Sequence, residues 1–195
     1  MDTDSELTSE QGKLLLQIAR AAISNVLGQA VAQPEPAGQS ADMLQAPGAS
    51  FVTLNQQGQL RGCIGSLEAR RPLLDDVKAN AVAAARHDPR FAPLSLSELD
   101  TTDVEVSVLS PMQPLHYDSE EHALAQLRPG VDGVVFEYGR YRSTFLPQVW
   151  EQLPSPRQFM AHLKQKAGLA PDFWAPGVRL QRYTVRKFKE SEGTS

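Results

Sequence analysis

The amino-acid sequence predicts an α+β fold in which an antiparallel sheet is flanked by helices. Two pairs of strand-like segments are separated only by short turns, at residues 55–58 and 139–140, and short turns join antiparallel neighbours. Several other segments carry apolar residues at helical spacing. Strands and helices do not alternate regularly, so a parallel sheet built from βαβ units is not expected. The content of 41% hydrophobic and 22% charged residues indicates a folded chain rather than a disordered one.

The first predicted helix begins at Thr8, which has the spacing of a capping box with Gln11. Apolar residues then recur at helical intervals, and Gly28 is suited to end this helix. The next segment, residues 29–50, is rich in Ala, Gln, Pro and Gly, so we expect a surface loop there. The whole chain, residues 1–195, is expected to form a single domain.

The remaining elements follow from apolar alternation, helical spacing and turn residues. Strands are predicted at residues 51–54, 59–67, 104–109, 133–138, 141–146 and 178–188. Helices are predicted at residues 72–87, 119–127 and 156–167, with one helical turn near residues 97–99. Pro72 and Pro156 are placed at the first helical position, which proline favours, and Gly168 is expected to end the last helix. Gly139 at the first position of its turn favours a type II′ hairpin.

Charge and hydropathy argue against polyanions and membranes as partners. The formal net charge is −4, so nothing attracts the chain generally to nucleic acid or to anionic lipid. The C-terminal segment does carry five basic residues: Arg179, Arg182, Arg186, Lys187 and Lys189. Such a run can follow a phosphate backbone but more often protects a solvated strand edge, so nucleic-acid binding is disfavoured. No apolar run reaches 18 residues and residues 1–6 are acidic, unlike a signal peptide, so we expect a cytoplasmic protein.

No metal or cofactor is expected. Cys63 is the only cysteine, so neither an internal disulfide nor a site with several thiolate ligands can form. The four histidines are not spaced as in known zinc motifs, and no glycine-rich phosphate loop is present. Those histidines are His87, His116, His122 and His162.

The segment Leu60–Gly65, with the sequence LRGCIG, is the most distinctive in the chain. On a strand, Arg61 and Cys63 would share one face, and Gly62 and Gly65 would let another backbone or a ligand come close. A functional interpretation makes Cys63 a reactive thiol in a cleft, with Arg61 binding an anion or a carbonyl oxygen. The alternative is that Cys63 is a small buried residue and the glycines only permit tight packing.

Polar residues also lie on the apolar stripe of the predicted helix 72–87. Asn80 either bonds to neighbouring backbone or reaches a cleft, and His87 either caps the last turn or assists Cys63. Asp88 and Arg90 follow directly and either pair with each other or present their charges to a ligand. A triad of Cys63, His87 and Asp88 is disfavoured, because adjacent residues rarely act as a base and the group that orients it.

The LRGCIG segment resembles the hallmark of the AMMECR domain family. Further blocks that resemble this family occur in the family's order and extend the resemblance over roughly residues 8–190. These blocks are Phe51–Leu54, Asn80–Ala81, Asp88–Phe91, Val106–Leu109, Phe145–Val149 and Lys166–Leu169, followed by Trp174. The resemblance implies two unequal α+β lobes with a cleft between them that the LRGCIG segment faces. Many relatives carry a second cysteine near Lys164, so a mechanism with two thiols is in doubt here.

Two functions are compatible with the sequence, and it stays open whether the chain is an enzyme. In the first, the cleft binds a partner protein or an extended polymer. The resemblance points to a Memo-like protein or a radical SAM enzyme as partner, because bacterial and archaeal relatives are often linked with these two. In the second, the chain is an enzyme or enzyme subunit with Cys63 as nucleophile and His87 assisting. The expected binding residues are Arg61, Gly62, Gly65, Asn80, Asp88 and Arg90.

Overall fold

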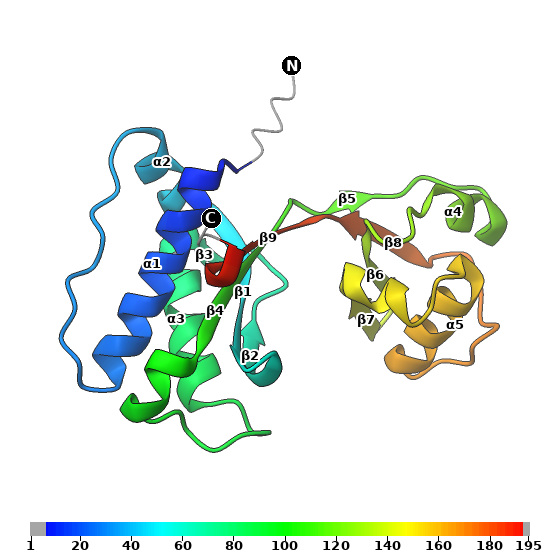
Figure 1. The fold of residues 1–195 in the computed structure, drawn as a ribbon. Coiled ribbons are helices and arrows are strands. Elements are labelled where there is room, and N and C mark those ends of the chain that lie inside the picture. Colours follow the sequence, from blue (N-terminus) through cyan, green and yellow to red (C-terminus); the bar gives the residue numbers. More distant parts are fainter. Residues whose placement is uncertain (1–6, 193–195) are drawn as a thin grey trace. The chain divides into compact units, whose positions relative to one another are not determined.

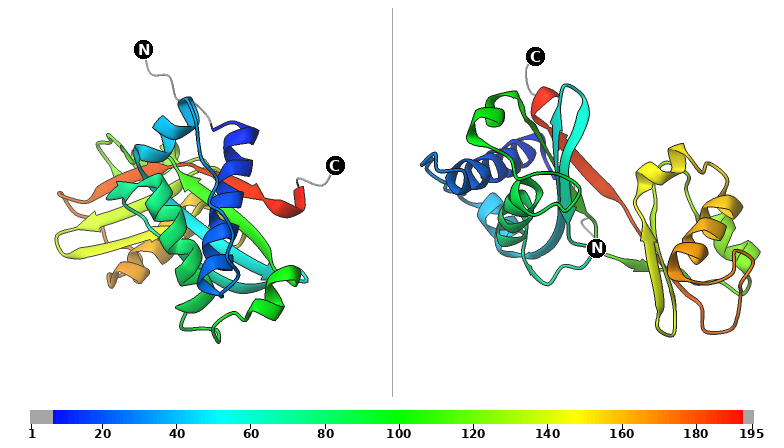
Figure 2. Two further views of the ribbon diagram at one scale, coloured as in Figure 1. Left: turned by 90° about the vertical axis from the view of Figure 1, so that its left-hand side faces the viewer. Right: turned by 90° about the horizontal axis from the view of Figure 1, so that it is seen from below.

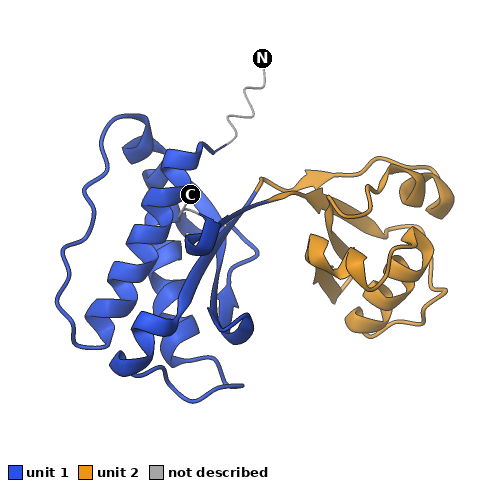
Figure 3. Ribbon diagram, in the orientation of Figure 1, with its two compact units in different colours: residues 1–109, 186–195 blue, residues 110–185 orange. Residues whose placement is uncertain are grey.

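The computed structural model describes residues 7–192, and the chain divides into two compact units. Unit 1 comprises residues 1–109 and 186–195, and unit 2 comprises residues 110–185 (Figure 3). The acidic stretch 1–6, which entered the expectation of a cytoplasmic protein, lies outside the described residues. Each unit combines helices with an antiparallel sheet, which confirms the predicted α+β class (Figure 1).

Unit 1 contains a sheet in the order β2-β1-β4-β9, and a short strand β3 also pairs with β1. The strands are β1 (Pro47–Gln56), β2 (Gln59–Gly65), β3 (Arg71–Pro72), β4 (Asp103–Leu109) and β9 (Val185–Lys189). The α-helices are α1 (Ser9–Val26), α2 (Gln39–Gln45) and α3 (Leu73–Arg86). Two 3₁₀ helices, η1 (Leu96–Thr101) and η3 (Glu190–Glu192), complete the unit. The predicted capping box of Thr8 and Gln11 is present at the start of α1.

Helices α1 and α3 cover one face of this sheet (Figure 2). Val52 and Leu54 of β1 point toward the helices and are fully buried. Side chains alternate along a strand, so Phe51 and Thr53 lie on the other face. Cys63 pairs directly with Thr53 in the register, and Gly65 pairs with Phe51, so all four residues share that face. We call these four residues, Phe51, Thr53, Cys63 and Gly65, the Cys63 face.

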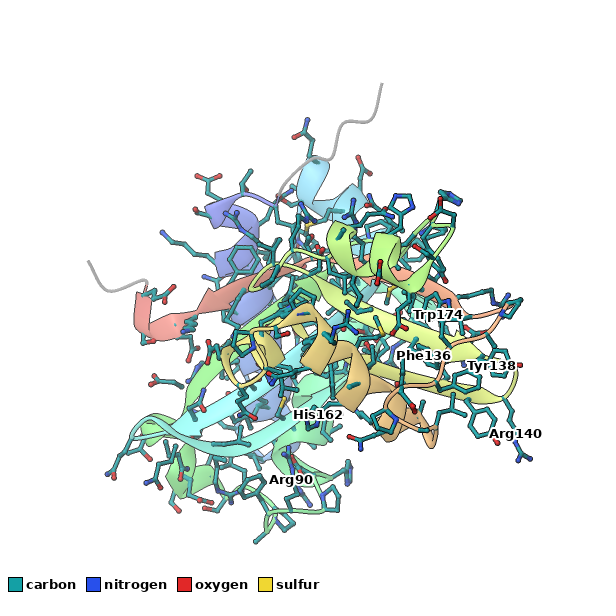
Figure 4. All side chains as sticks on the ribbon, turned by 90° about the vertical axis from the view of Figure 1, so that its right-hand side faces the viewer. Arg90, Phe136, Tyr138, Arg140, His162 and Trp174 are labelled. Atoms are coloured by element: carbon teal, nitrogen blue, oxygen red, sulfur yellow. The ribbon has the colours of Figure 1, made fainter. Side chains whose placement is uncertain are left out.

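Unit 2 contains a sheet in the order β5-β8-β6-β7. Its strands are β5 (Gln113–Pro114), β6 (Gly133–Tyr138), β7 (Tyr141–Phe145) and β8 (Arg179–Tyr183). Its helices are α4 (Glu120–Gln126), the 3₁₀ helix η2 (Pro147–Glu151) and α5 (Pro156–Ala167). The core is aromatic, since the Trp150 and Phe159 rings stack with centroids 3.8 Å apart and Phe136 is fully buried beside them. Tyr138 and Trp174, labelled in Figure 4, pack at the margin of this core.

Two sequence predictions about elements are wrong and several are confirmed. The segment 29–50 is not a loop throughout, because it contains α2 and the start of β1, and Leu44 is fully buried. The predicted strand 178–188 is two strands, β8 and β9, which belong to different sheets and are separated at Thr184. The positive φ angles of Gly139 (55°) and Gly168 (96°) confirm the predicted hairpin turn and helix end.

Candidate functional site

Cys63 lies on β2, which is the edge strand of the unit 1 sheet, and its side chain is half-buried. The hydroxyl of Thr53, directly opposite on β1, donates a hydrogen bond to Cys63 Sγ at 3.3 Å. On antiparallel strands, the side chains of two opposed residues come closest when those residues do not exchange backbone hydrogen bonds. The short distance between Thr53 and Cys63 is consistent with a pair of this kind. The thiol is therefore held against the sheet rather than projecting freely.

The outward-facing backbone of Cys63 is bonded by two side chains instead of by a neighbouring strand. The N–H of Cys63 donates to Asp88 Oδ2 at 3.0 Å, and Arg90 Nη2 donates to the carbonyl oxygen of Cys63 at 3.2 Å. Asp88 and Arg90 also pair with each other, with an Nη2–Oδ2 distance of 2.8 Å. We call this arrangement the edge clamp; Figure 4 labels Arg90, whose side chain is 54% exposed.

The edge clamp holds its carboxylate in the charged form. Hydrogen bonds from the Arg90 guanidinium, followed by the N–H of Cys63, hold the pKa of Asp88 well below its usual range and outweigh the opposing effect of burial. The same ion pair raises the pKa of Arg90. Asp88 and Arg90 therefore pair with each other, one of the two possibilities that the sequence left open.

Arg61 is occupied by contacts within the chain. The register of β1 and β2 slips at this point, so Arg61 is the extra residue of a β-bulge and the predicted alternation with Cys63 is interrupted. Its guanidinium donates to Glu98 at 3.2 Å and to the carbonyl oxygen of Ala92 at 2.9 Å. It also lies 6.0 Å from the centroid of the Phe91 ring. Arg61 thus ties the segment after α3 to the edge of the sheet.

Both glycines of the LRGCIG segment make room for the protein itself. A β-carbon on Gly62 would lie 2.3 Å from the carbonyl oxygen of Ala84 in α3. One on Gly65 would lie 2.2 Å from the ring of Phe51, on the neighbouring strand. These contacts support the tight-packing interpretation of the two glycines, since a helix backbone and an aromatic ring fill the space.

Asn80 belongs to a buried polar network that joins α3 to Ser50 and Ser66, which lie at one end of the Cys63 face, next to the pair Phe51 and Gly65. Its Nδ2 lies 3.0 Å from both the carbonyl oxygen of Ser50 and Asp76 Oδ2. Asp76, 1% exposed, also accepts from the N–H and hydroxyl of Ser50, at 2.8 and 2.7 Å, and from the hydroxyl of Ser66 at 2.7 Å. Arg71 donates to Asp76 at 2.8 Å. Asp76 was not predicted from the sequence, although it stands one helical turn before Asn80.

The structure does not join His87 to Cys63. The backbone N–H of His87 donates to Ala83 and closes α3, and its imidazole is exposed. Within residues 7–192, no hydrogen bond connects that imidazole to Cys63, Asp88 or any other side chain. The same part of the chain holds no group of three His, Cys, Asp or Glu residues placed to bind a metal ion.

Lys164 and the basic residues near the C-terminus, both noted in the sequence, are paired with other side chains in the structure. Lys164, where many relatives are expected to have cysteine, is buried, donates to Glu120 and lies 5.5 Å from the Trp174 ring centroid. Of the basic residues near the C-terminus, Arg179, Arg182, Lys187 and Lys189 each form an ion pair with a carboxylate. No described helix is both long and apolar enough to cross a membrane.

The site therefore brings together Arg61, Gly62, Cys63, Asp88 and Arg90 at the edge of β2, with every charged group paired inside unit 1. Asn80 lies in the adjoining network, and His87 lies apart from it. The arrangement offers a rigid surface, since each polar side chain is fixed by at least one hydrogen bond. A general base in hydrogen-bond contact with the thiol is absent among the described residues.

Comparisons with known proteins agree with this architecture. Protein MJ0810 of Methanocaldococcus jannaschii is 37% identical over 196 residues, which cover 95% of this chain and 93% of that protein. A protein of Methanothermobacter thermautotrophicus is 39% identical over 190 residues, covering 94% and 96% of the two chains. The crystal structure of uncharacterized protein PH0010 from Pyrococcus horikoshii matches with a TM-score of 0.79 and 34% identity, covering 94% of this chain and 93% of that one. The model of the AMMECR1 family matches residues 16–188, which confirms the predicted resemblance: the chain belongs to the AMMECR1 family.

Proposed function

We propose that the Cys63 face is a docking surface for a partner protein. The observation that carries this proposal is that α1 and α3 cover only the opposite face of the sheet, while all four residues of the Cys63 face are partly exposed. A Memo-like protein or a radical SAM enzyme is the partner that the family resemblance suggests.

The chemistry of the surface supports a protein rather than a polyanion as the occupant. An aromatic ring (Phe51), a hydroxyl and a thiol lie side by side, with the guanidinium of Arg90 at the edge. Aromatic and arginine side chains are enriched at protein interfaces. Because hydrogen bonds already fix the Thr53 hydroxyl and the Arg90 guanidinium, ordering these two groups on docking would cost little entropy.

The experiment compares two lysine substitutions in binding to a purified Memo-like protein and a purified radical SAM enzyme from the same organism. Thr53→Lys places a long charged side chain in the centre of the Cys63 face and should weaken binding at least about 10-fold. Thr101→Lys makes the same chemical change at an exposed residue of η1 and should have no effect. Isothermal titration calorimetry gives both affinities, and circular dichroism confirms that each variant is folded.

Cys63→Ser serves as the companion variant, since it keeps the shape of the side chain and replaces the thiol with a hydroxyl. A docking surface should tolerate it nearly unchanged, because the chemistry of sulfur is not used. If Thr53→Lys binds both candidates as tightly as the unaltered chain does, the Cys63 face is not the interface.

A second candidate function, nucleophilic catalysis by Cys63, is favoured by two specific contacts. The hydroxyl of Thr53 donates to Sγ, and the guanidinium of Arg90 is bonded to the carbonyl of the same residue. Hydroxyl donors and nearby guanidinium groups stabilise negative charge on a sulfur, and the thiolate is the reactive form of cysteine. Against this function stands the absence, among the described residues, of a hydrogen-bonded base.

Thiol labelling separates the two functions, and the chain has a single cysteine, so intact mass reports on Cys63 alone. For a catalytic thiol, iodoacetamide should react quickly with the native protein even well below pH 8.5, about where ordinary thiols ionise. Thr53→Val should then slow the reaction. Slow labelling of the native chain at neutral pH would rule out the nucleophile and leave the docking surface.

A further inference from the structure

We propose that a pocket on the sheet of unit 2 binds a small organic carboxylate through Arg179. The pocket has a volume of about 590 Å³, and all its lining residues belong to unit 2. That volume lies within the range of about 300–1,000 Å³ typical of small-molecule sites. The pocket shares no residue with the Cys63 face, so the proposal is independent of the proposed function.

The pocket lies over three neighbouring strands. Pro114 of β5 pairs with Gln181 of β8, and Gln181 pairs with Val135 of β6, so their side chains share one face of the sheet. The opposite face carries Phe136 and Leu180, which pack into the core with α5. The apolar side chains on the pocket's face of the sheet are those of Pro114, which is exposed, and Val135, which is 2% exposed. Leu115, Val178 and Leu180 also line the pocket, but they belong to the core cluster.

A row of charges crosses the same face. Glu137 of β6 is directly opposite Arg179 on β8 and directly opposite Arg142 on β7. Its carboxylate accepts a hydrogen bond from Arg179 Nη2 and lies 4.0 Å from Arg142 Nε. One carboxylate thus faces two guanidinium groups.

Arg179 is the group that can bind a ligand. Its side chain is 71% exposed, and among the described residues its guanidinium donates to Glu137 alone. A guanidinium carries five N–H donors in a planar fork, which matches the two oxygens of a carboxylate. Glu137 also faces Arg142, so a ligand that drew Arg179 away would not leave that carboxylate without a cation.

The apolar lining of the pocket favours some anions over others. An organic carboxylate can place its charged group at Arg179 and its hydrocarbon body against Pro114 and Val135. Inorganic phosphate can engage Arg179 but gains nothing from the apolar walls. The pocket therefore selects an anion with an apolar body of small-molecule size.

The test is an NMR titration of the ¹⁵N-labelled full chain with three probes: 4-phenylbutyrate, its uncharged amide 4-phenylbutanamide, and inorganic phosphate. We expect 4-phenylbutyrate to shift the amide signals of Leu115, Val135 and Arg179 and to bind at least about 10-fold more tightly than the amide or phosphate. Arg179→Gln should reduce binding of 4-phenylbutyrate by a similar factor. Arg157→Gln, at an exposed arginine of α5 that does not line the pocket, should leave it unchanged.

A second variant tests the location. His116 is exposed and lines the pocket, so His116→Trp should fill the space and abolish binding of 4-phenylbutyrate without disturbing the core. The proposal is overturned if 4-phenylbutyrate leaves the three amide signals unmoved. It is equally overturned if the amide or phosphate binds as tightly as 4-phenylbutyrate, or if Arg179→Gln or His116→Trp has no effect.

Discussion

At Gly62 a side chain would not fit, because the carbonyl oxygen of Ala84 occupies the place where a β-carbon would stand. This contact lets α3 approach β2 at backbone distance, and the following residue, Cys63, is held to the turn after α3 by the edge clamp. The most distinctive residues of the sequence therefore fix the position of a helix against an edge strand. Their value for function lies in the rigidity that results.

The first prediction compares the two glycines of the LRGCIG segment. Gly62→Ala should lower the free energy of unfolding by about 1–3 kcal/mol, because the carbonyl of Ala84 is fixed within α3. Gly65→Ala should cost less, since the Phe51 side chain is partly exposed and can rotate away. Urea unfolding gives both values, and equal effects of the two substitutions would contradict the argument.

The second prediction concerns how acid pH changes the contribution of Glu98 to the free energy of unfolding. The pKa of Glu98 is lowered from 4.5 to about 2, first by the N–H of Ser95 and then by the Arg61 guanidinium. A carboxyl group with a lowered pKa in the folded state stabilises the fold above its ordinary pKa, and this contribution is lost as the pH falls toward 2. Glu98→Gln should therefore destabilise the chain at pH 7, and the difference should shrink between pH 4.5 and 2.

Urea unfolding at several pH values measures this difference. Glu151→Gln, which changes an exposed carboxylate in unit 2, is the matched control and should show a much smaller difference at every pH. A Glu98→Gln deficit that stays constant down to pH 2 would show that the charge of Glu98 is not what stabilises the fold.

At the scale of elements, the C-terminal segment is fixed by a carboxylate beyond its last strand. Glu190 of η3 receives two hydrogen bonds from Arg20 of α1, at 2.5 and 2.6 Å, and one from the N–H of Val104 in β4, at 2.8 Å. Just before it, the ring of Phe188 rests on Gly12, where a β-carbon would lie 2.0 Å away. Strand β9 is therefore attached at its far end to both a helix and a neighbouring strand.

The third prediction uses two glutamates of the same 3₁₀ helix. Glu190→Gln keeps the shape but removes the charge, and it should lower the free energy of unfolding by about 1–2 kcal/mol because the pair is only partly buried. Glu192→Gln should change it by less than about 0.5 kcal/mol, since that side chain is 69% exposed. Thermal unfolding monitored by circular dichroism distinguishes them, and an equal response would show that the tie to Arg20 contributes nothing.

Elements with strong local signals could be predicted from the sequence, and elements that depend on distant partners could not. The hairpin at Gly139 and the helix end at Gly168 require left-handed backbone, which glycine signals locally. The division between β8 and β9 has no such signal. Thr184 is β-branched and suits a strand, yet its backbone pairs with Ser110 while the strands on either side join different sheets.

The candidate site follows the same pattern. Cys63, Asp88 and Arg90 could be singled out from the sequence because an unusual glycine-rich strand and a rigid Asp-Pro-Arg turn stand out locally. That the turn bonds the backbone of Cys63 depends on how α3 packs, which spacing alone does not reveal. Asp76 was missed for a related reason, since its partners Ser50 and Ser66 come from two other segments.

At the scale of the whole molecule, the two units have separate cores. The core of unit 1 is built from α1, α3 and the sheet around β1, and the core of unit 2 from α5 and the sheet around β6. All the tryptophan and tyrosine residues of the chain lie in unit 2. The two longest described α-helices, α1 and α3, lie in unit 1. Intrinsic fluorescence therefore reports on unit 2, and circular dichroism of helices reports mainly on unit 1.

The fourth prediction follows from this separation. Ile18→Ala removes a fully buried side chain from the core of unit 1 and should cost about 2–5 kcal/mol there. In urea, the midpoint seen by circular dichroism at 222 nm should fall more than the midpoint seen by tryptophan emission. Leu163→Ala, in the core of unit 2, should reverse this order. Equal shifts of both midpoints would mean that the chain unfolds as one cooperative body.

The edge clamp also bears on how copies of this chain behave when crowded. An open strand edge is a template on which another chain can add a strand, and such additions lead to aggregation. At Cys63 that template is closed, because a buried carboxylate and a guanidinium already hold the N–H and C=O that a newcomer would need. Any chain that paired there would first have to expel Asp88, whose side chain is 2% exposed. The turn that helps to shape the candidate site thus also keeps β2 from recruiting another copy of the chain.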